Sequence, residues 1–365
     1  MKQYCKSVIS VILCIALCGC KSNNKDEFEP EYNSVITSNI SESHNHHTHS
    51  STDSTHTEKP VPEAESFSPL VDRRPIKCGN TLEQNASYGH YCSYEGKTYY
   101  VDLNDGFMYC SDFKTDTPTL VLKDYVRALN CYDGYIYYIK GDKENFEQME
   151  YFYKGSVWRL NLSTREEECI IDDNPINLCL VVNEYGVFCN KAGGGIALFD
   201  YDGNYLKTIS DINQGIYIID NWILLRKEDK TVFLNLDTGE ESEFFDIVPT
   251  ARCGDRLVGF SMDNQWVKQM FDLSTGEIIT LPESYMFSFA YHKDTLYAIS
   301  NYAVFRYDDN NGFTEISALE YLGELYFMSI FSSGDKLVTV VMNQENAAWL
   351  AEISESDGSM TLPGG

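Results

Sequence analysis

The chain has 365 residues, with 28 Lys and Arg against 55 Asp and Glu, and a formal net charge of −27. Nucleic acids and anionic lipid head groups repel so acidic a protein, which excludes nucleic-acid binding and a basic membrane-binding patch. The 26 Tyr and 19 Phe residues are concentrated after about residue 67, a composition typical of β-strands.

The N-terminus has the pattern of a secretory signal. Lys2 and Lys6 precede an apolar run of about ten residues, too short for the roughly 20 that span a bilayer as a helix. The run ends in Leu17-Cys-Gly-Cys20, which resembles the lipobox of bacterial lipoproteins. The resemblance implies that residues 1–19 are a removed signal peptide. It also implies that Cys20 receives diacylglycerol and palmitate and holds the protein at the outer face of the bacterial cell membrane.

Residues 20–66 are rich in Ser, Thr, His, Glu and Asn and have almost no apolar periodicity. Such a segment cannot bury enough apolar surface to offset its ordering entropy, so we predict a disordered tether. Its imidazoles lie close enough in sequence to converge on zinc or another divalent metal, although the favoured interpretation is a polar spacer that happens to be His-rich, because nothing rigid organises the ligands. No other cofactor is expected. The candidate metal ligands are His44, His46, His47, His49 and His56.

A repeated phrase begins near residue 67 and continues towards the end of the chain. It reads as an apolar strand, a two-residue polar turn, a second strand, a longer loop, a third strand, a further turn and a fourth strand. Gly and Asn supply the positive-φ positions that hairpin turns require. The turns between first and second strands recur at spacings of 38, 52, 35, 34, 39 and 41 residues. They are Glu95-Gly96, Asp133-Gly134, Tyr185-Gly186, Asp220-Asn221, Gly254-Asp255, Lys293-Asp294 and Gly334-Asp335.

Hairpins between third and fourth strands align with the same period. The clearest copies are residues 157–165, 232–240 and 270–277, with looser copies at 196–203 and 304–312. Units of about 40 residues with four strands each predict an all-β fold, a β-propeller of about seven blades over residues 67–365. Six or eight blades remain open, because the first and last units are the least regular.

The 52-residue interval contains an insertion at residues 141–155, between the second and third strands of the second blade. Loops of a propeller vary without harm to the strands and commonly carry function. We therefore expect this loop to contact a partner through its aromatic residues, which are Phe146, Tyr151, Phe152 and Tyr153.

Three segments resemble an extracellular bacterial propeller family known as the domain of unknown function 5050, similar to low-density-lipoprotein-receptor-related propellers. They are Cys78-Gly-Asn-Thr81, followed by Asn85; Asp133-Gly-Tyr-Ile-Tyr-Tyr138; and Gly155-Ser-Val-Trp-Arg-Leu160. The resemblance covers roughly residues 78–320. It implies the propeller fold and an extracellular location, and it carries over no catalytic residue.

The eight cysteines beyond the tether show no C-x-x-C pair, so their spacing fits neither a zinc site nor a small disulfide scaffold. Most are predicted to be buried apolar residues. One or two disulfides remain open. The eight are Cys78, Cys92, Cys110, Cys131, Cys169, Cys179, Cys189 and Cys253.

The first strands of the blades would line the central channel, where few polar residues accompany them. Arg127, Asn130 and Arg252 are the residues that we expect to face a ligand, with salt bridges between blades as the alternative for the arginines. The tryptophans fall on strands, where they either stack on a sugar or pack between blades. They are Trp158, Trp222, Trp266 and Trp349.

No Gly-x-Ser-x-Gly, His-Glu-x-x-His or P-loop motif is present, and the predicted propeller has only two histidines, His90 and His292, around which a Ser-His-Asp arrangement remains open. The sequence favours a non-enzymatic, monomeric binding module for a surface protein, peptide or glycan, and it assigns no catalytic residue. One alternative is a hydrolase or lyase of extracellular polysaccharide that uses the channel mouth and a pair of carboxyl groups. The other is a metal-capture lipoprotein that uses the His-rich tether.

Overall fold

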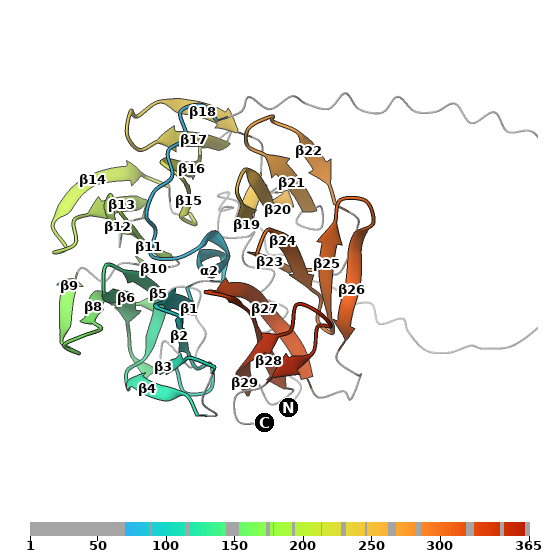
Figure 1. Ribbon diagram of the computed structural model, residues 1–365. Coiled ribbons are helices and arrows are strands. Elements are labelled where there is room, and N and C mark those ends of the chain that lie inside the picture. Colours follow the sequence, from blue (N-terminus) through green and yellow to red (C-terminus); the bar gives the residue numbers. More distant parts are fainter. Residues whose placement is uncertain are drawn as a thin grey trace, which may run out of the picture. The chain divides into compact units, whose positions relative to one another are not determined.

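The computed structural model describes residues 70–361 except 88, 114–116, 144–152, 173–175, 178, 192–193, 213, 228–230, 245–246, 262–267, 282–285, 319–324 and 344–346. Seven four-stranded antiparallel sheets stand in a ring, each built from strands that follow one another in sequence (Figure 1). The fold is a seven-bladed β-propeller, which confirms the predicted fold class.

The first three blades follow the chain in order. Blade 1 contains β1 (Tyr91–Tyr94), β2 (Lys97–Val101), β3 (Met108–Ser111) and β4 (Thr119–Leu122). Blade 2 contains β5 (Val126–Tyr132), β6 (Tyr135–Lys140), β8 (Ser156–Asn161) and β9 (Glu167–Ile171). Blade 3 contains β11 (Leu180–Asn183), β12 (Gly186–Asn190), β13 (Ile196–Phe199) and β14 (Tyr205–Ser210).

The remaining four blades repeat this order. Blade 4 contains β15 (Tyr217–Ile219), β16 (Trp222–Arg226), β17 (Thr231–Asn235) and β18 (Glu241–Phe244). Blade 5 contains β19 (Ile247–Cys253), β20 (Arg256–Ser261), β21 (Lys268–Asp272) and β22 (Ile278–Thr280). Blade 6 contains β23 (Ser288–His292), β24 (Thr295–Ile299), β25 (Ala303–Asp308) and β26 (Gly312–Ala318). Blade 7 contains β27 (Leu325–Ser333), β28 (Lys336–Asn343), β29 (Ala348–Ile353) and β30 (Met360–Thr361).

Six of the seven predicted turns join the first and second strands of a blade at the predicted residues. In blade 3 the turn lies one residue earlier, at Glu184 and Tyr185, because Gly186 already pairs with Asn183 in the second strand. In blade 2, for example, Tyr132 pairs with Tyr135 across a turn whose central residues, Asp133 and Gly134, have φ of 50° and 81°. Two consecutive positive φ angles are the requirement of the type I′ hairpin turn, which explains the residue types that made the period visible.

The insertion in blade 2 leaves β6 at Lys140 and returns to β8 at Ser156, which confirms its predicted place between the second and third strands. Its last residues form β7 (Tyr153–Lys154), which pairs with β10 (Ile176–Asn177) in the link between blades 2 and 3. Residues 144–152 lie outside the described part of the chain.

The apolar core lies between neighbouring blades. One cluster joins Val157 and Ile139 of blade 2 to Val187 and Ala197 of blade 3, and similar clusters join other neighbours around the ring. Strand β12 is buried at all five positions, whereas the outer strand β14 of the same blade is exposed or half-buried throughout. The inner strands therefore have apolar residues on both faces, as expected for sheets packed on both sides.

The ring closes between blades 7 and 1 through side chains, because blade 7 draws its four strands from one continuous segment, β27–β30. The rings of Tyr91 and Phe331 stack with centroids 3.4 Å apart. The hydroxyls of Ser93 and Ser333 lie 2.8 Å apart, and Ala348 donates its backbone N–H to the Asn104 side chain. These contacts hold the two ends of the ring together.

Candidate functional site

A segment before the first blade, residues 70–81, crosses one face of the ring and enters the central channel (Figure 1). We call it the strap. Leu70 is buried in the apolar cluster that blades 4 and 5 share, beside Ile219 and Trp222. The strap touches the turns between first and second strands and between third and fourth strands, so it lies on the face of the propeller that carries those turns.

Asp220 is the centre of an ion-pair cluster beneath the strap. It is 8% exposed and accepts two hydrogen bonds, each 2.8 Å long, from the Arg252 guanidinium of the next blade. Arg73 of the strap lies 3.7 Å from Asp220 and donates a 2.6 Å hydrogen bond to Asp255. Hydrogen bonds from Arg73 and then Ser274 lower the pKa of Asp255 to about 2. The cluster joins the strap to blades 4 and 5.

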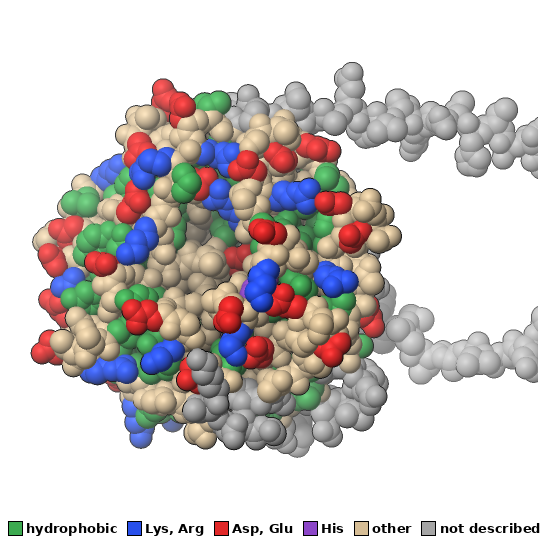
Figure 2. Space-filling view, viewed as in Figure 1, with side chains coloured by type: hydrophobic (Ala, Val, Ile, Leu, Met, Phe, Trp, Pro, Cys, Tyr) green, Lys and Arg blue, Asp and Glu red, His purple; other side chains and the backbone are tan. Residues whose placement is uncertain are grey.

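Arg74 continues this attachment on the solvent side. Its guanidinium reaches Asp237 in blade 4 and both Glu184 and Tyr185 in blade 3. Hydrogen bonds from Arg74 and then from the Tyr185 hydroxyl lower the pKa of Asp237 to about 2. Figure 2 shows cationic and anionic side chains interspersed over the visible face rather than gathered by sign.

The strap then descends along the inner strands of blades 2 and 3. Cys78 forms an isolated β-bridge with Asn183, and Gly79 donates its N–H to the Val182 carbonyl at 2.7 Å. Farther in, the buried Asn80 side chain donates to the Leu129 carbonyl at 2.5 Å. These bonds satisfy polar groups that would otherwise be unpaired in the channel.

Helix α2 (Leu82–Ala86) fills the centre of the ring. Thr81 caps its N-terminus by accepting from the Gln84 N–H at 3.3 Å, while the Gln84 side chain accepts from the Thr81 N–H at 2.9 Å. This reciprocal capping box stabilises a helix too short to persist alone. The helix packs against β19, β15 and β27, so it plugs the channel that the first strands surround.

Glu83 carries the carboxyl group of the plug. Its side chain is 5% exposed, and Oε1 accepts from the Tyr291 N–H of blade 6 at 3.3 Å. Burial raises the pKa of Glu83 above its usual value, and hydrogen bonds from the protein offset part of that effect. Glu83 therefore anchors the plug to an inner strand.

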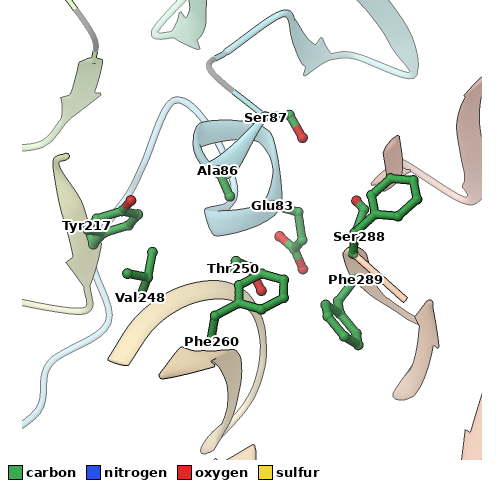
Figure 3. A pocket seen from close by; sticks show the side chains of 10 residues that line it. Glu83, Ala86, Ser87, Tyr217, Val248, Thr250, Phe260, Ser288 and Phe289 are labelled. Carbon is green, nitrogen blue, oxygen red and sulfur yellow. The ribbon is translucent and has the colours of Figure 1, made fainter. Parts of the chain in front are cut away.

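A small cavity of about 50 Å³ lies beside the plug, between the helix and blades 4 to 6. Figure 3 shows the Glu83 side chain pointing from the helix towards Thr250 and Ser288 across this space. A volume of that size holds a few water molecules. Its lining is Glu83, Ala86, Ser87, Tyr217, Val248, Thr250, Phe260, Phe287, Ser288 and Phe289.

The cavity and the strap occupy opposite ends of the channel. Tyr217 and Ser288 begin the first strands of their blades, and Phe260 stands near the end of a second strand. These positions lie at the face that carries the links between second and third strands and between blades. The blade 2 insertion is one of those links, so it emerges on the same face as the cavity.

The three predicted channel residues have different surroundings and do not form one site. Asn130 is fully buried; its amide donates to the Leu180 carbonyl at 2.7 Å, and its oxygen accepts from the Val182 N–H at 3.2 Å. Arg252 pairs with Asp220 as described, the inter-blade salt bridge that was the alternative for it. Arg127 is half-buried on β5, and its charge contributes to lowering the pKa of His90.

Most other predicted site residues lie outside the described part of the chain: Cys20, His44, His46, His47, His49, His56, Phe146, Tyr151 and Phe152. Tyr153 pairs with Asn177 through its backbone in β7. Among the tryptophans, Trp222 is buried between blades, Trp349 is 41% exposed, and Trp158 lies beneath the Lys140 ammonium at 4.6 Å. Trp266 also lies outside the described residues.

His292 joins blades 6 and 7 through a chain of polar groups. Its Nδ1 lies 2.8 Å from the Ser332 hydroxyl, and its Nε2 lies 3.2 Å from Glu355. The order serine, histidine, carboxylate is that of a hydrolytic triad. Glu355 also pairs with Lys293, and the cavity described above has a different lining. These contacts link blades 6 and 7.

Sequence reasoning missed the strap and the plug helix. The signal was present, since Thr81-x-x-Gln84 is the capping-box pattern that marks a helix start. In the residues that the structure describes, no helix is long and apolar enough to cross a membrane. The same residues contain no group of three or more His, Cys, Asp or Glu side chains placed to hold a metal ion.

No protein-family model matches the chain, and no curated protein matches it in sequence. Solved structures show the same fold. A puromycin-hydrolysing peptidase of Mycobacterium tuberculosis matches with a TM-score of 0.52 and 10% identity over 80% of this chain and 56% of that one. An acylaminoacyl peptidase matches with a TM-score of 0.51 and 9% identity over 77% of this chain and 53% of that one. The chain thus spans about half the length of these peptidases.

A chain of the mitotic checkpoint complex matches over nearly its whole length. Its TM-score is 0.50 at 10% identity, over 85% of this chain and 96% of that one. At such low identities the three likenesses establish the propeller fold alone.

Proposed function

We propose that this protein is a non-enzymatic binding module, a lipid-anchored propeller that presents one loop face to a surface protein, peptide or glycan. The observation that carries the proposal is the filled channel. The strap and α2 leave a cavity of about 50 Å³ beside the plug, far below the roughly 300–1,000 Å³ of small-molecule sites. Recognition therefore falls to the loops of the face that the strap leaves free, where the insertion emerges.

The polysaccharide hydrolase or lyase is the weaker candidate. That chemistry needs two carboxyl groups flanking a bond at an open mouth. Here one carboxyl group, that of Glu83, lines the cavity, and it is bound to the backbone of blade 6. The peptidases with a similar propeller carry about half their length outside the match, so their chemistry does not transfer to this chain.

Deleting residues 143–153 is expected to abolish partner binding and to leave the melting temperature nearly unchanged. The insertion leaves and rejoins neighbouring strands of blade 2, so its removal keeps every strand of the four-stranded sheet and takes away only the two-residue pairing of β7 with β10. The measurement is a cross-linked pull-down from intact source cells with the labelled propeller, residues 67–365. An excess of unlabelled propeller should prevent the capture of a specific partner.

A matched control changes the same blade on the opposite face. Thr164→Ala alters the exposed turn between β8 and β9 and is expected to keep the partner. Equal capture by the deletion and by the unmodified propeller would show that the insertion is not the contact surface.

Lipid anchoring at Cys20 is the second part of the proposal, supported by the leader sequence described above. Cells that express the full chain with metabolic palmitate label are expected to yield a labelled protein in the membrane fraction. Cys20→Ser removes the thiol that would be acylated, so the label should disappear and the protein should leave the membrane. Cys5→Ser keeps that thiol and should remain labelled; an unlabelled parent protein would refute the anchor.

A further inference from the structure

Two buried cysteines face each other between the first two blades. Cys92 lies on β1 and Cys131 on β5, 39 residues apart in sequence, and their Sγ atoms are 2.7 Å apart. Cys92 is fully buried and Cys131 is 6% exposed. Two non-bonded sulfur atoms do not approach so closely, while a disulfide bond brings them to about 2.05 Å. The side chains are therefore oriented towards bond formation.

We propose that Cys92 and Cys131 form a disulfide that joins the first strands of blades 1 and 2 when the chain folds in an oxidising compartment. The oxidant is a disulfide, either of a thiol–disulfide oxidoreductase or of oxidised glutathione. The two cysteine thiols lose two protons and two electrons and form one S–S bond, and the oxidant disulfide is cleaved to two thiols.

The groups around Cys92 and Cys131 favour a disulfide between these two residues over metal binding. Cys110 of β3 belongs to the same apolar cluster, and it is half-buried beside the strand that carries Tyr99. Among the described residues no set of three Cys, His, Asp or Glu side chains is placed for a metal. A pair of thiols in an apolar site without a metal partner is chemically suited to a disulfide.

The timing of the bond follows from burial. Desolvation is the main reason why the pKa of the Cys92 thiol is raised, and the thiolate is the form that attacks a disulfide. The folded protein therefore reacts slowly, and we expect the bond to form before blades 1 and 2 have closed on each other. Once formed, it is shielded from small reductants.

The bond also has a structural role at the ring closure. Strand β1 is only four residues long, and Tyr91 at its start stacks on Phe331 of blade 7. A covalent link from β1 to β5 fixes the other side of the same strand. Because the bond closes a loop of 39 residues, it also restricts the unfolded chain.

The direct test is peptide mapping of the full chain after refolding with oxidised and reduced glutathione. The protein is denatured, alkylated without reduction and digested with trypsin. We expect peptides 78–97 and 128–140 to appear as one cross-linked species that reduction separates. Peptide 78–97 also contains Cys78, so a Cys78→Ser variant should keep the cross-link. Alkylated Cys92 and Cys131 in the unreduced digest would overturn the proposal.

Stability provides a second readout that does not depend on mapping. Reducing the oxidised protein under denaturing conditions and refolding it with reductant is expected to lower the melting temperature by about 5 °C or more. The Cys92→Ala/Cys131→Ala variant should lose this dependence on redox state, and Cys110→Ala should keep it. Equal redox sensitivity in both variants would place the bond elsewhere and refute the pairing.

Discussion

The Asp220→Ala variant is expected to lose about 3–5 kcal/mol of unfolding free energy, because removal of one partner from a buried ion pair leaves the other charge uncompensated. Asp220 accepts both hydrogen bonds of a bidentate contact with Arg252, and the Arg73 guanidinium lies near the same carboxylate. The side chains of Arg252 and Arg73 are only 24% and 15% exposed, so water replaces the lost partner poorly. Urea denaturation of residues 67–365 gives the free energy.

A neighbouring arginine supplies the matched control. Arg256 follows Arg252 in the same hairpin and pairs with Asp309 of blade 6, with side chains 47% and 62% exposed. Exposed pairs contribute about 0–1 kcal/mol, so Asp309→Ala should have a small effect. Similar losses in the two variants would show that the Asp220 cluster does not hold the strap and blades together.

The blades were predictable because their signal is local. A two-residue turn such as Asp133-Gly134 needs positive φ angles at both positions, and only a few residue types supply them at low cost. Repetition of that signal at about 40 residues reveals the blades. The interval of 52 residues between the turns of blades 2 and 3 is longer than the others, and this excess reveals the insertion in blade 2. Each inference depends on residues within one hairpin.

The site was less predictable because its contacts join segments distant in sequence. Arg252 and Asp220 are 32 residues apart on different blades, and Arg73 reaches Asp255 across 182 residues. No local pattern reports such pairs. Asn130 illustrates the ambiguity, since a polar residue on an inner strand has the same sequence context whether it binds a ligand or the neighbouring strand. Its amide binds the neighbouring strand.

The plug itself explains why the two faces differ. Charged side chains of the strap hold it to six turns of one face, and α2 closes the channel from that side. The other face keeps the small cavity and the insertion. A loop deletion on that face and a charge change under the strap should therefore separate binding from stability, which the variants above measure independently.

His90 and Glu83 are expected to make the free energy of unfolding change with pH in opposite directions. Desolvation, and then the charge of Arg127, lowers the pKa of His90 to about 3. The unfolded chain takes up that proton near pH 6.5, so the His90 contribution decreases as the pH falls from about 6.5 to 3. Glu83 has a raised pKa, so its contribution is full below about pH 4.5 and is lost as the pH rises towards the folded value.

The Glu83 contribution changes upwards from about pH 4.5 and the His90 contribution changes up to about pH 6.5, so single variants separate them. In His90→Gln the Glu83 effect remains, and stability should fall as the pH rises across that window. In Glu83→Gln the His90 effect remains, and stability should rise with pH by about 1.4 kcal/mol per unit.

Asp237→Asn is the control, because a carboxyl group with a pKa of about 2 changes the slope only below about pH 4. Urea midpoints at half-unit steps measure the slopes, and parallel curves for the two variants would contradict both assignments. Opposite slopes would show that burial in the folded protein acts on Glu83 of the plug helix and on His90 before β1 in opposite directions.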